Sequence, residues 1–267
     1  MEARAEVGVF GGSGFYSFRD GVEEIRVDTP YGAPSDKVAI AEVSRRRVAF
    51  LPRHGRDHSH PAHAVNYRAN VWALKHLGVT QILAPCACGS LQPDIHPGDF
   101  VILDQFVDRT RARKDTYFDG PITHHIAAAE PYCARLREVA LAQARAQGIT
   151  THPTGTMVVI QGPRFSTRAE STFFTRQGWH VVGMTQYPEA ILAKELGLCY
   201  TGIALVTDYD VGVAGDMARP PVEIEEVLRV MESNNEHVKA LIHAVVGAVG
   251  GHRDCSCEAE SLAAVMG

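Results

Sequence analysis

Two carboxylates, Asp208 and Asp210, follow the apolar stretch Ile203–Val206. Residues two apart at the end of a strand point to the same side, so both side chains can face one ligand. Neighbouring carboxylates perturb each other's pKa, so one of the two can keep a proton near neutral pH and donate it. The same pair could instead bind a metal ion or cap a solvated loop.

Cationic and small residues elsewhere could bind an anion. Arg53 and His54 follow the predicted strand Val48–Leu51, and strand ends are where α/β sheets bind ligands. Arginine presents a planar pair of donors to phosphate, and histidine can donate to the same oxygens. The loop GGSG, which contains Ser13, would let the backbone approach an anion closely. A surface ion pair at Arg53 and a tight turn at GGSG are the competing interpretations.

Two further segments could contact an organic ligand. In QGPRFS, Phe165 can stack on an aromatic group while Ser166 bonds its edge, although a phenylalanine at a helix entry often packs into the core. In APCACGS, backbone amides can face a ligand. Packing of small buried side chains is the simpler explanation of its two thiols, Cys86 and Cys88.

Histidines cluster at His54, His58 and His60, which raises the question of a metal ion. No cysteine stands at ligand spacing beside them, and Asp57 is the only carboxylate close by in the sequence. Zinc sites use a fuller set of such ligands. The sequence therefore predicts no metal site.

The elements that must position these residues alternate between strands and helices, which predicts one α/β domain over residues 1–267 around a mixed sheet. The expected strands are Val7–Phe10, Val38–Val43, Val48–Leu51, Gln81–Ala84, Phe100–Leu103, Gly155–Ile160, Val181–Val182 and Ile203–Val206. The expected helices are Asn66–Leu77, Ala127–Gln147, Thr167–Gly178, Pro188–Leu196 and Val222–Val246. The irregular stretch 104–125 is long enough to be functional or mobile. The tail, about residues 250–267, is expected to be frayed, with Cys255 and Cys257 as exposed thiols.

Composition and charge narrow the function classes. The 267 residues are 45 % apolar with a net charge of −5, which is typical of a globular protein and argues against a nucleic-acid binder. Six cysteines are too few for a disulfide framework in a chain of this length. No segment reaches the roughly 18 apolar residues of a membrane span, and the start lacks the pattern of a secretory signal. A cytoplasmic protein with no membrane or nucleic-acid partner is therefore expected.

Several motifs together resemble the methylthioadenosine phosphorylase family, within the trimeric purine nucleoside phosphorylases. In chain order they are GGSG, RHGRDH, NYRANVWALK, ACGSL, GPRFSTRAES, MTQYPE and TDYD, and they extend from about Val7 to Asp210. The resemblance implies a phosphorylase-type α/β sandwich, with a mixed, partly barrel-like central sheet flanked by helices. It also implies a homotrimer, or a dimer of trimers.

The resemblance further implies a reaction. The family uses inorganic phosphate to cleave the N-glycosidic bond of S-methyl-5′-thioadenosine or a related 5′-deoxyadenosine. The products are adenine and 5-methylthioribose 1-phosphate, which enter purine and methionine salvage. Phosphate is a co-substrate, and no cofactor is implied. A methylthioinosine or general purine nucleoside phosphorylase is the alternative, followed by a non-catalytic nucleoside-binding protein.

The family's site residues carry over by position onto this chain. Those matched to the phosphate site are Ser13, Arg53, His54, Cys86, Ala87 and Thr185, with Cys86 standing where the family commonly has threonine. Those matched to the nucleoside site are His58, His125, Phe165, Ser166, Met184, Asp208 and Asp210, with His125 lent to a neighbouring subunit. The resemblance implies two catalytic roles. A protonated Asp208 donates a hydrogen to purine N7, and an ionised Asp210 accepts a hydrogen bond from the N6 amino group. In relatives that prefer 6-oxopurines, asparagine commonly takes the Asp208 position, so this pair favours a 6-aminopurine.

Overall fold

The computed structural model of the protein describes residues 5–11, 22–213 and 220–266. The strands are β1 (Val7–Gly11), β2 (Glu23–Ile25), β3 (Val38–Val43), β4 (Arg46–Pro52), β5 (Gln81–Ser90), β6 (Phe100–Ile102), β7 (Gln105–Arg109), β8 (Thr123–His124), β9 (Thr151–His152), β10 (Thr156–Ile160), β11 (Val181–Gly183), β12 (Cys199–Tyr209) and β13 (Val265–Met266). The helices are α1 (Tyr67–His76), α2 (Ala134–Ala146), α3 (Arg168–Arg176), α4 (Gln186–Glu195), α5 (Ile224–Ala248) and α6 (Cys257–Ala263).

A mixed sheet organises the molecule and branches at β5. In the described part of the chain its main path has the order β2-β3-β4-β1-β5-β11-β10-β7. One edge of β5 pairs in parallel with β1 and then antiparallel with β11, while β12 pairs in parallel along the other edge. β6 and β9 continue the branch beyond β12. The predicted mixed sheet with flanking helices is thereby confirmed.

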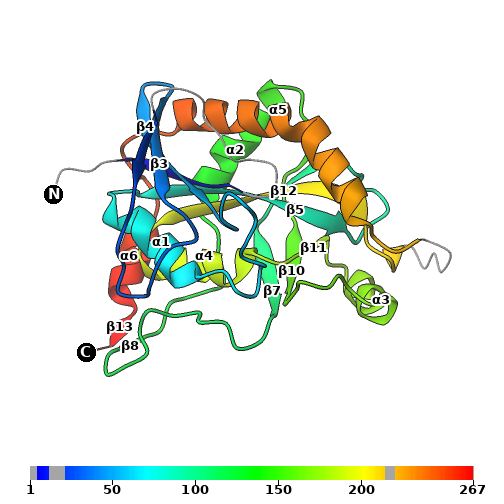
Figure 1. Cartoon of the computed structure of the whole chain (residues 1–267), viewed down its shortest axis with the longest axis horizontal. Helices are drawn as coiled ribbons and strands as arrows, with labels where there is room; N and C mark the ends of the chain where they lie inside the picture. Colours follow the sequence, from blue (N-terminus) through cyan, green and yellow to red (C-terminus); the bar gives the residue numbers. More distant parts are fainter. Residues whose placement is uncertain (1–4, 12–21, 214–219, 267) are drawn as a thin grey trace.

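The central strands of this sheet, β1, β4, β5 and β12, are buried on both faces, and they carry apolar residues at successive positions. In β4, Val48 and Phe50 enter the core on one face, and Ala49 and Leu51 enter the core on the other. Helices α2 and α5 cover the first face, and α1 and α4 cover the second (Figure 1). Strands enclosed in this way appear in a sequence as continuous apolar runs rather than as alternating patterns.

Local signals in the sequence set two helix starts. Thr167 and Glu170 form the predicted capping box, in which each side chain accepts a hydrogen bond from the other residue's backbone N–H, and α3 follows it. Tyr187 has non-helical backbone angles within α4, so the regular helix begins at Pro188, as predicted.

Some predicted bounds are wrong. Strand β5 continues to Ser90 rather than ending at Ala84, because its later residues still pair with β12. Helix α2 begins at Ala134 rather than Ala127, because Pro131 disfavours a helical conformation at the residue before it. β12 is longer than the predicted Ile203–Val206, because its polar end continues to pair with β5. The stretch 104–125, expected to be irregular, contains β7 and β8.

The prediction of a frayed tail with exposed thiols is also wrong for the described residues. Cys257 is buried and Cys255 is half-buried. The Ser261 hydroxyl on α6 donates to the carbonyl of Glu195 at 2.7 Å, and β13 pairs antiparallel with β8. The C-terminal segment is therefore part of the folded body. None of the described helices is long and apolar enough to cross a membrane.

Candidate functional site

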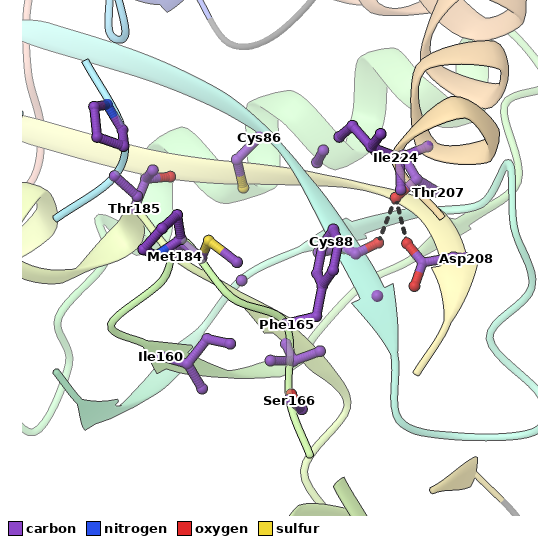
Figure 2. A pocket seen from close by; sticks show the side chains of 18 of the residues that line it. Cys86, Cys88, Ile160, Phe165, Ser166, Met184, Thr185, Thr207, Asp208 and Ile224 are labelled. Carbon is purple, nitrogen blue, oxygen red and sulfur yellow. Dashed lines mark hydrogen bonds between the residues drawn. The ribbon is translucent and has the colours of Figure 1, made fainter. Parts of the chain in front are cut away.

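A cavity of about 330 Å³ lies beside the carboxyl ends of β4, β11 and β12, a volume suited to a small organic ligand. The predicted site residues that line it are Arg53, His54, His58, Cys86, Ala87, Phe165, Ser166, Met184, Thr185, Asp208 and Asp210. Figure 2 shows Cys86 and Thr185 toward one end and Asp208 toward the other. Ser13 falls outside the described residues. His125 is exposed and is not among the lining residues.

Arg53 supplies the positive charge of the cavity and is held rigidly. Its Nε and Nη2 donate to the two carboxylate oxygens of Glu189 at 2.7 and 2.8 Å, and Nη1 donates to the carbonyl of Pro85 at 3.1 Å. Glu189 also accepts from the hydroxyl of Tyr200 at 2.7 Å. Burial alone would lower the pKa of Arg53, but attraction to Glu189 outweighs burial and raises it. Two of the five guanidinium N–H groups remain for a ligand.

His54 is a neutral acceptor beside this cation. Burial and the charge of Arg53 lower the pKa of His54 to about 4. Its Nδ1 lies 2.8 Å from the carbonyl oxygen of His60, which can only accept, so Nδ1 carries the hydrogen. Its Nε2 is therefore free to accept from a protonated oxygen of an anion. The ring stacks on His58 with centroids 4.6 Å apart.

Small and neutral groups surround the same end of the cavity. Burial raises the pKa of Cys86 to about 11, so this residue is a neutral thiol and a weak donor. Thr185 precedes α4 but makes no capping hydrogen bond, which leaves its hydroxyl for a ligand. Met184 packs over Gly162, whose φ is +64° and where a β-carbon would lie 2.6 Å from the Met184 sulfur. The positive φ favours glycine here, and a larger residue would displace the flexible Met184 side chain from its place over this turn.

Asp208 reaches the other end of the cavity because β12 bulges at Thr207. The register with β5 pairs Val206 with Cys88 and Asp208 with Gly89, so Thr207 is the extra residue. Consecutive side chains, Thr207 and Asp208, therefore both line the cavity.

The environment of Asp208 favours its protonated form. Burial raises its pKa to about 6, with a smaller contribution from Asp210, although the Thr207 hydroxyl opposes the rise. That hydroxyl lies 2.7 Å from Oδ1 of Asp208 and 3.2 Å from the carbonyl of Cys88 (Figure 2). Its hydrogen bond to Oδ1 stabilises the charged form and so limits the rise in the pKa, while burial keeps the pKa above its ordinary value.

Asp210 and Ser166 present a buried acceptor and a buried hydroxyl to the cavity. Asp210 is 2 % exposed, and burial raises its pKa. Nearby Ser171 and Ser166 hydroxyls oppose that rise, yet by strict hydrogen-bond geometry Oδ2 of Asp210 and Oγ of Ser166 are without a partner among the described residues. Buried polar atoms are rarely left unpaired, so this pair indicates a ligand edge that carries both a donor and an acceptor.

Apolar side chains enclose the same end of the cavity. Phe165 is 39 % exposed, which leaves its ring available for stacking. Ile224 and Val227, from the first turn of α5, also line the cavity. A flat apolar ligand with a polar edge therefore suits the carboxylate end, and an anion suits the Arg53 end.

Sequence reasoning missed four of these contributors. Glu189 lies in the motif MTQYPE, which by itself indicates no role for it, although it holds Arg53. Thr207 adjoins a predicted site residue, yet a bulge leaves no periodic signal in the sequence. Ile224 and Val227 lie in the predicted helix Val222–Val246, where nothing in the sequence marks them as cavity residues.

The chain matches the model of the phosphorylase superfamily over residues 6–247. It belongs to the phosphorylase superfamily. It is 52 % identical to a purine nucleoside phosphorylase of Streptomyces coelicolor, over 97 % of this chain and 95 % of that protein. It is 47 % identical to an S-methyl-5′-thioadenosine phosphorylase of Thermofilum pendens, over 95 % of this chain and 96 % of that one. A methylthioadenosine phosphorylase from Schistosoma mansoni in complex with adenine superposes with a TM-score of 0.90 at 38 % identity, covering 97 % of this chain and 98 % of that one.

Arg113 positions two walls of the cavity in this phosphorylase. Its guanidinium donates to the carbonyls of Met184 at 2.8 Å and Gln161 at 2.9 Å. Lysine lacks the rigid planar donors of a guanidinium, so it cannot hold both carbonyls in this arrangement. Arg113→Lys is therefore expected to lower kcat/KM by roughly 10- to 100-fold. Steady-state kinetics on nucleoside and phosphate check this. Arg111→Lys, at an exposed arginine two residues away, is the matched control, and equal kinetics for both variants would contradict the role.

Proposed function

We propose that this protein catalyses the phosphate-dependent cleavage of S-methyl-5′-thioadenosine, or a related 5′-deoxyadenosine, to adenine and 5-methylthioribose 1-phosphate. The observation that carries the proposal is one cavity with a rigid guanidinium and two buried carboxyl groups among its lining residues. The guanidinium suits phosphate, and the two carboxyl groups suit a base that carries an amino group. The relatives named as S-methyl-5′-thioadenosine phosphorylases support the same choice.

The carboxyl pair supports adenine as the leaving base. A protonated Asp208 can donate to the N7 acceptor, where negative charge develops as the bond breaks. The unpaired Asp210 Oδ2 can accept from the N6 amino group, and the unpaired Ser166 hydroxyl can bond the same edge. A 6-oxopurine would set its carbonyl oxygen against Asp210, which costs about 1–3 kcal/mol for a lost hydrogen bond to a charged group.

The cation end supports phosphate as the nucleophile. Arg53 holds the anion with its two remaining N–H groups, and His54 Nε2 accepts from a protonated phosphate oxygen. Phosphate then attacks C1′ on the face opposite the base, with inversion and without a covalent enzyme intermediate. The protein contributes positioning and electrostatic stabilisation of the separating charges.

The 5′ substituent is assigned to the wall that contains His58. Pro61 and Ala62 line the cavity with it, and burial lowers the pKa of His58. A neutral imidazole beside apolar groups suits a thioether better than a hydroxyl or a phosphate.

The base assignment is tested by comparing kcat/KM for methylthioadenosine, methylthioinosine and adenosine at saturating phosphate. Methylthioadenosine should exceed methylthioinosine by roughly 10- to 100-fold, from one lost hydrogen bond to a charged group. A preference for methylthioinosine would keep the reaction but overturn the assignment. The relative named purine nucleoside phosphorylase makes this alternative the one to test, and no turnover of any nucleoside would favour a binding protein.

The pH dependence should report the proton on Asp208. Because its pKa is raised to about 6, the carboxyl loses its proton as pH rises through 6. At saturating phosphate, kcat/KM for methylthioadenosine should fall above that pH, approaching tenfold per pH unit. The fall should be absent in Asp208→Asn. The same fall in that variant would assign it to another group.

We also propose that a homotrimer completes the site. His125 is exposed and outside its own cavity, while its backbone N–H donates to the carbonyl of Ala264 at 3.0 Å. It is thus fixed on the surface, as a residue lent to a neighbour would be. Sedimentation equilibrium tests the assembly, and a monomer that is fully active would exclude it. A cytoplasmic role in purine and methionine salvage, with no cofactor, belongs to the same proposal.

A further inference from the structure

Four cysteines from three segments meet on the side of the sheet covered by α2 and α5. Cys133 is the residue before α2, Cys199 begins β12, and Cys255 and Cys257 lie in the C-terminal segment. Their sulfur atoms all lie within 4.8 Å of one another. All four are free thiols, and Cys133, Cys199 and Cys257 are buried. None of them lines the cavity.

We propose that these four cysteines form a structural zinc site. A tetrahedral site with Zn–S bonds of about 2.3 Å has sulfur atoms about 3.8 Å apart along every edge. The cluster is close to this arrangement, because each sulfur lies within 4.8 Å of all three others; the short separation of 3.2 Å between Cys199 and Cys255 would open by about 0.6 Å around an ion. Two separate disulfides would require sulfur atoms to be close only within each bonded pair, whereas here the sulfur atoms are close between the pairs as well. Four thiolates without an open position are typical of a structural rather than a catalytic zinc ion.

Groups around the cluster suit the negative charge of four thiolates on a divalent ion. Arg135 Nη2 lies 3.9 Å from the Cys199 sulfur. Nη2 also donates to Gln81, whose Nε2 donates to the carbonyl of Gly250 at 3.0 Å, so the outer contacts are themselves fixed. Cys133 precedes the first turn of α2, where the helix dipole favours an anion. Such outer contacts orient metal ligands and stabilise their charge.

The site would fasten the C-terminal segment to the sheet. Cys255 and Cys257 precede and begin α6, while Cys133 and Cys199 belong to the body of the fold. After α6, β13 pairs with β8, and the backbone N–H of His125 donates to Ala264. A bound ion would therefore stabilise the segment that holds β8. The sequence predicted no metal site because the ligands are distant in the chain and only two of them form a short motif.

The first test is metal binding by the whole purified protein, kept reduced and prepared without chelators. We expect about one zinc ion per chain by mass spectrometry of metals. Replacing zinc with Co²⁺ should produce sulfur-to-cobalt charge-transfer bands and the visible bands of a tetrahedral ion. A strong chelator should lower the midpoint of thermal unfolding, and added Zn²⁺ should restore it. A thiol reductant alone should leave the midpoint unchanged.

Variants assign the ligands. The double variant Cys255→Ser, Cys257→Ser should lose at least nine-tenths of the bound zinc, whereas Cys88→Ser, at a buried cysteine outside the cluster, should keep it. Reversible removal of zinc from the wild type keeps the test decisive if the double variant fails to fold. Reduced protein that binds no added zinc would overturn the proposal. Two disulfides with a midpoint sensitive to reductant but not to chelator would also overturn it.

Discussion

Replacing Asp208 by asparagine is expected to lower kcat/KM for methylthioadenosine by roughly 10²- to 10⁴-fold, the range of a lost general acid. Asparagine fills the same space beside Thr207 but cannot release a proton to the purine. Its amide can instead donate to the oxygen of a 6-oxopurine, so relative activity on methylthioinosine should rise. Steady-state kinetics with both nucleosides at saturating phosphate measure the two changes together.

Asp94→Asn is the matched control, because it removes one carboxylate from an exposed position away from the cavity. It should leave both values of kcat/KM within about twofold, as expected for a surface substitution. If Asp208→Asn kept activity on methylthioadenosine close to the wild type, Asp208 would not be the proton donor.

The second large effect is expected from Glu189→Gln, which leaves the buried Arg53 without its counter-charge. The side chains of Arg53 and Glu189 are 1 % and 0 % exposed, and their two hydrogen bonds are short. Removing one partner of such a pair costs about 3–5 kcal/mol, because the other charge stays buried. Chemical denaturation should show this loss in the free energy of unfolding. Phosphate should stabilise the variant more than the wild type, since it supplies the missing negative charge.

Glu236→Gln serves as the control for that measurement. Glu236 pairs with Lys239 one helical turn away, with the Glu236 side chain 84 % exposed. Exposed pairs contribute about 0–1 kcal/mol, so this variant should unfold almost like the wild type. Equal effects of the two substitutions would mean that Glu189 does not hold Arg53 as the structure indicates.

Much of the site could be predicted because its residues follow apolar strands. Arg53 comes directly after β4 and Met184 directly after β11, and strand ends gather ligands in sheets of this kind. These positions depend on local signals, since each strand contains an apolar run and its end is marked by Pro52 or Gly183. Family motifs then assigned roles that strand ends alone leave open.

What could not be predicted depends on contacts between distant segments. Glu189 acts through Arg53, which is 136 residues away in the chain, so no local pattern marks the pair. The bulge at Thr207 is a change of register against β5, and the period of a strand does not reveal it. Cys257 was expected in a frayed tail because its partners Cys133 and Cys199 come from other elements.

The most direct test of the account is whether adenine release depends on phosphate. The purified protein would be incubated with methylthioadenosine, with and without inorganic phosphate, while adenine and sugar phosphate are quantified. The account predicts adenine release only with phosphate, and one 5-methylthioribose 1-phosphate formed for each adenine. Equal release without phosphate, with free methylthioribose as the product, would show hydrolysis and contradict the assignment of Arg53 and His54 to phosphate.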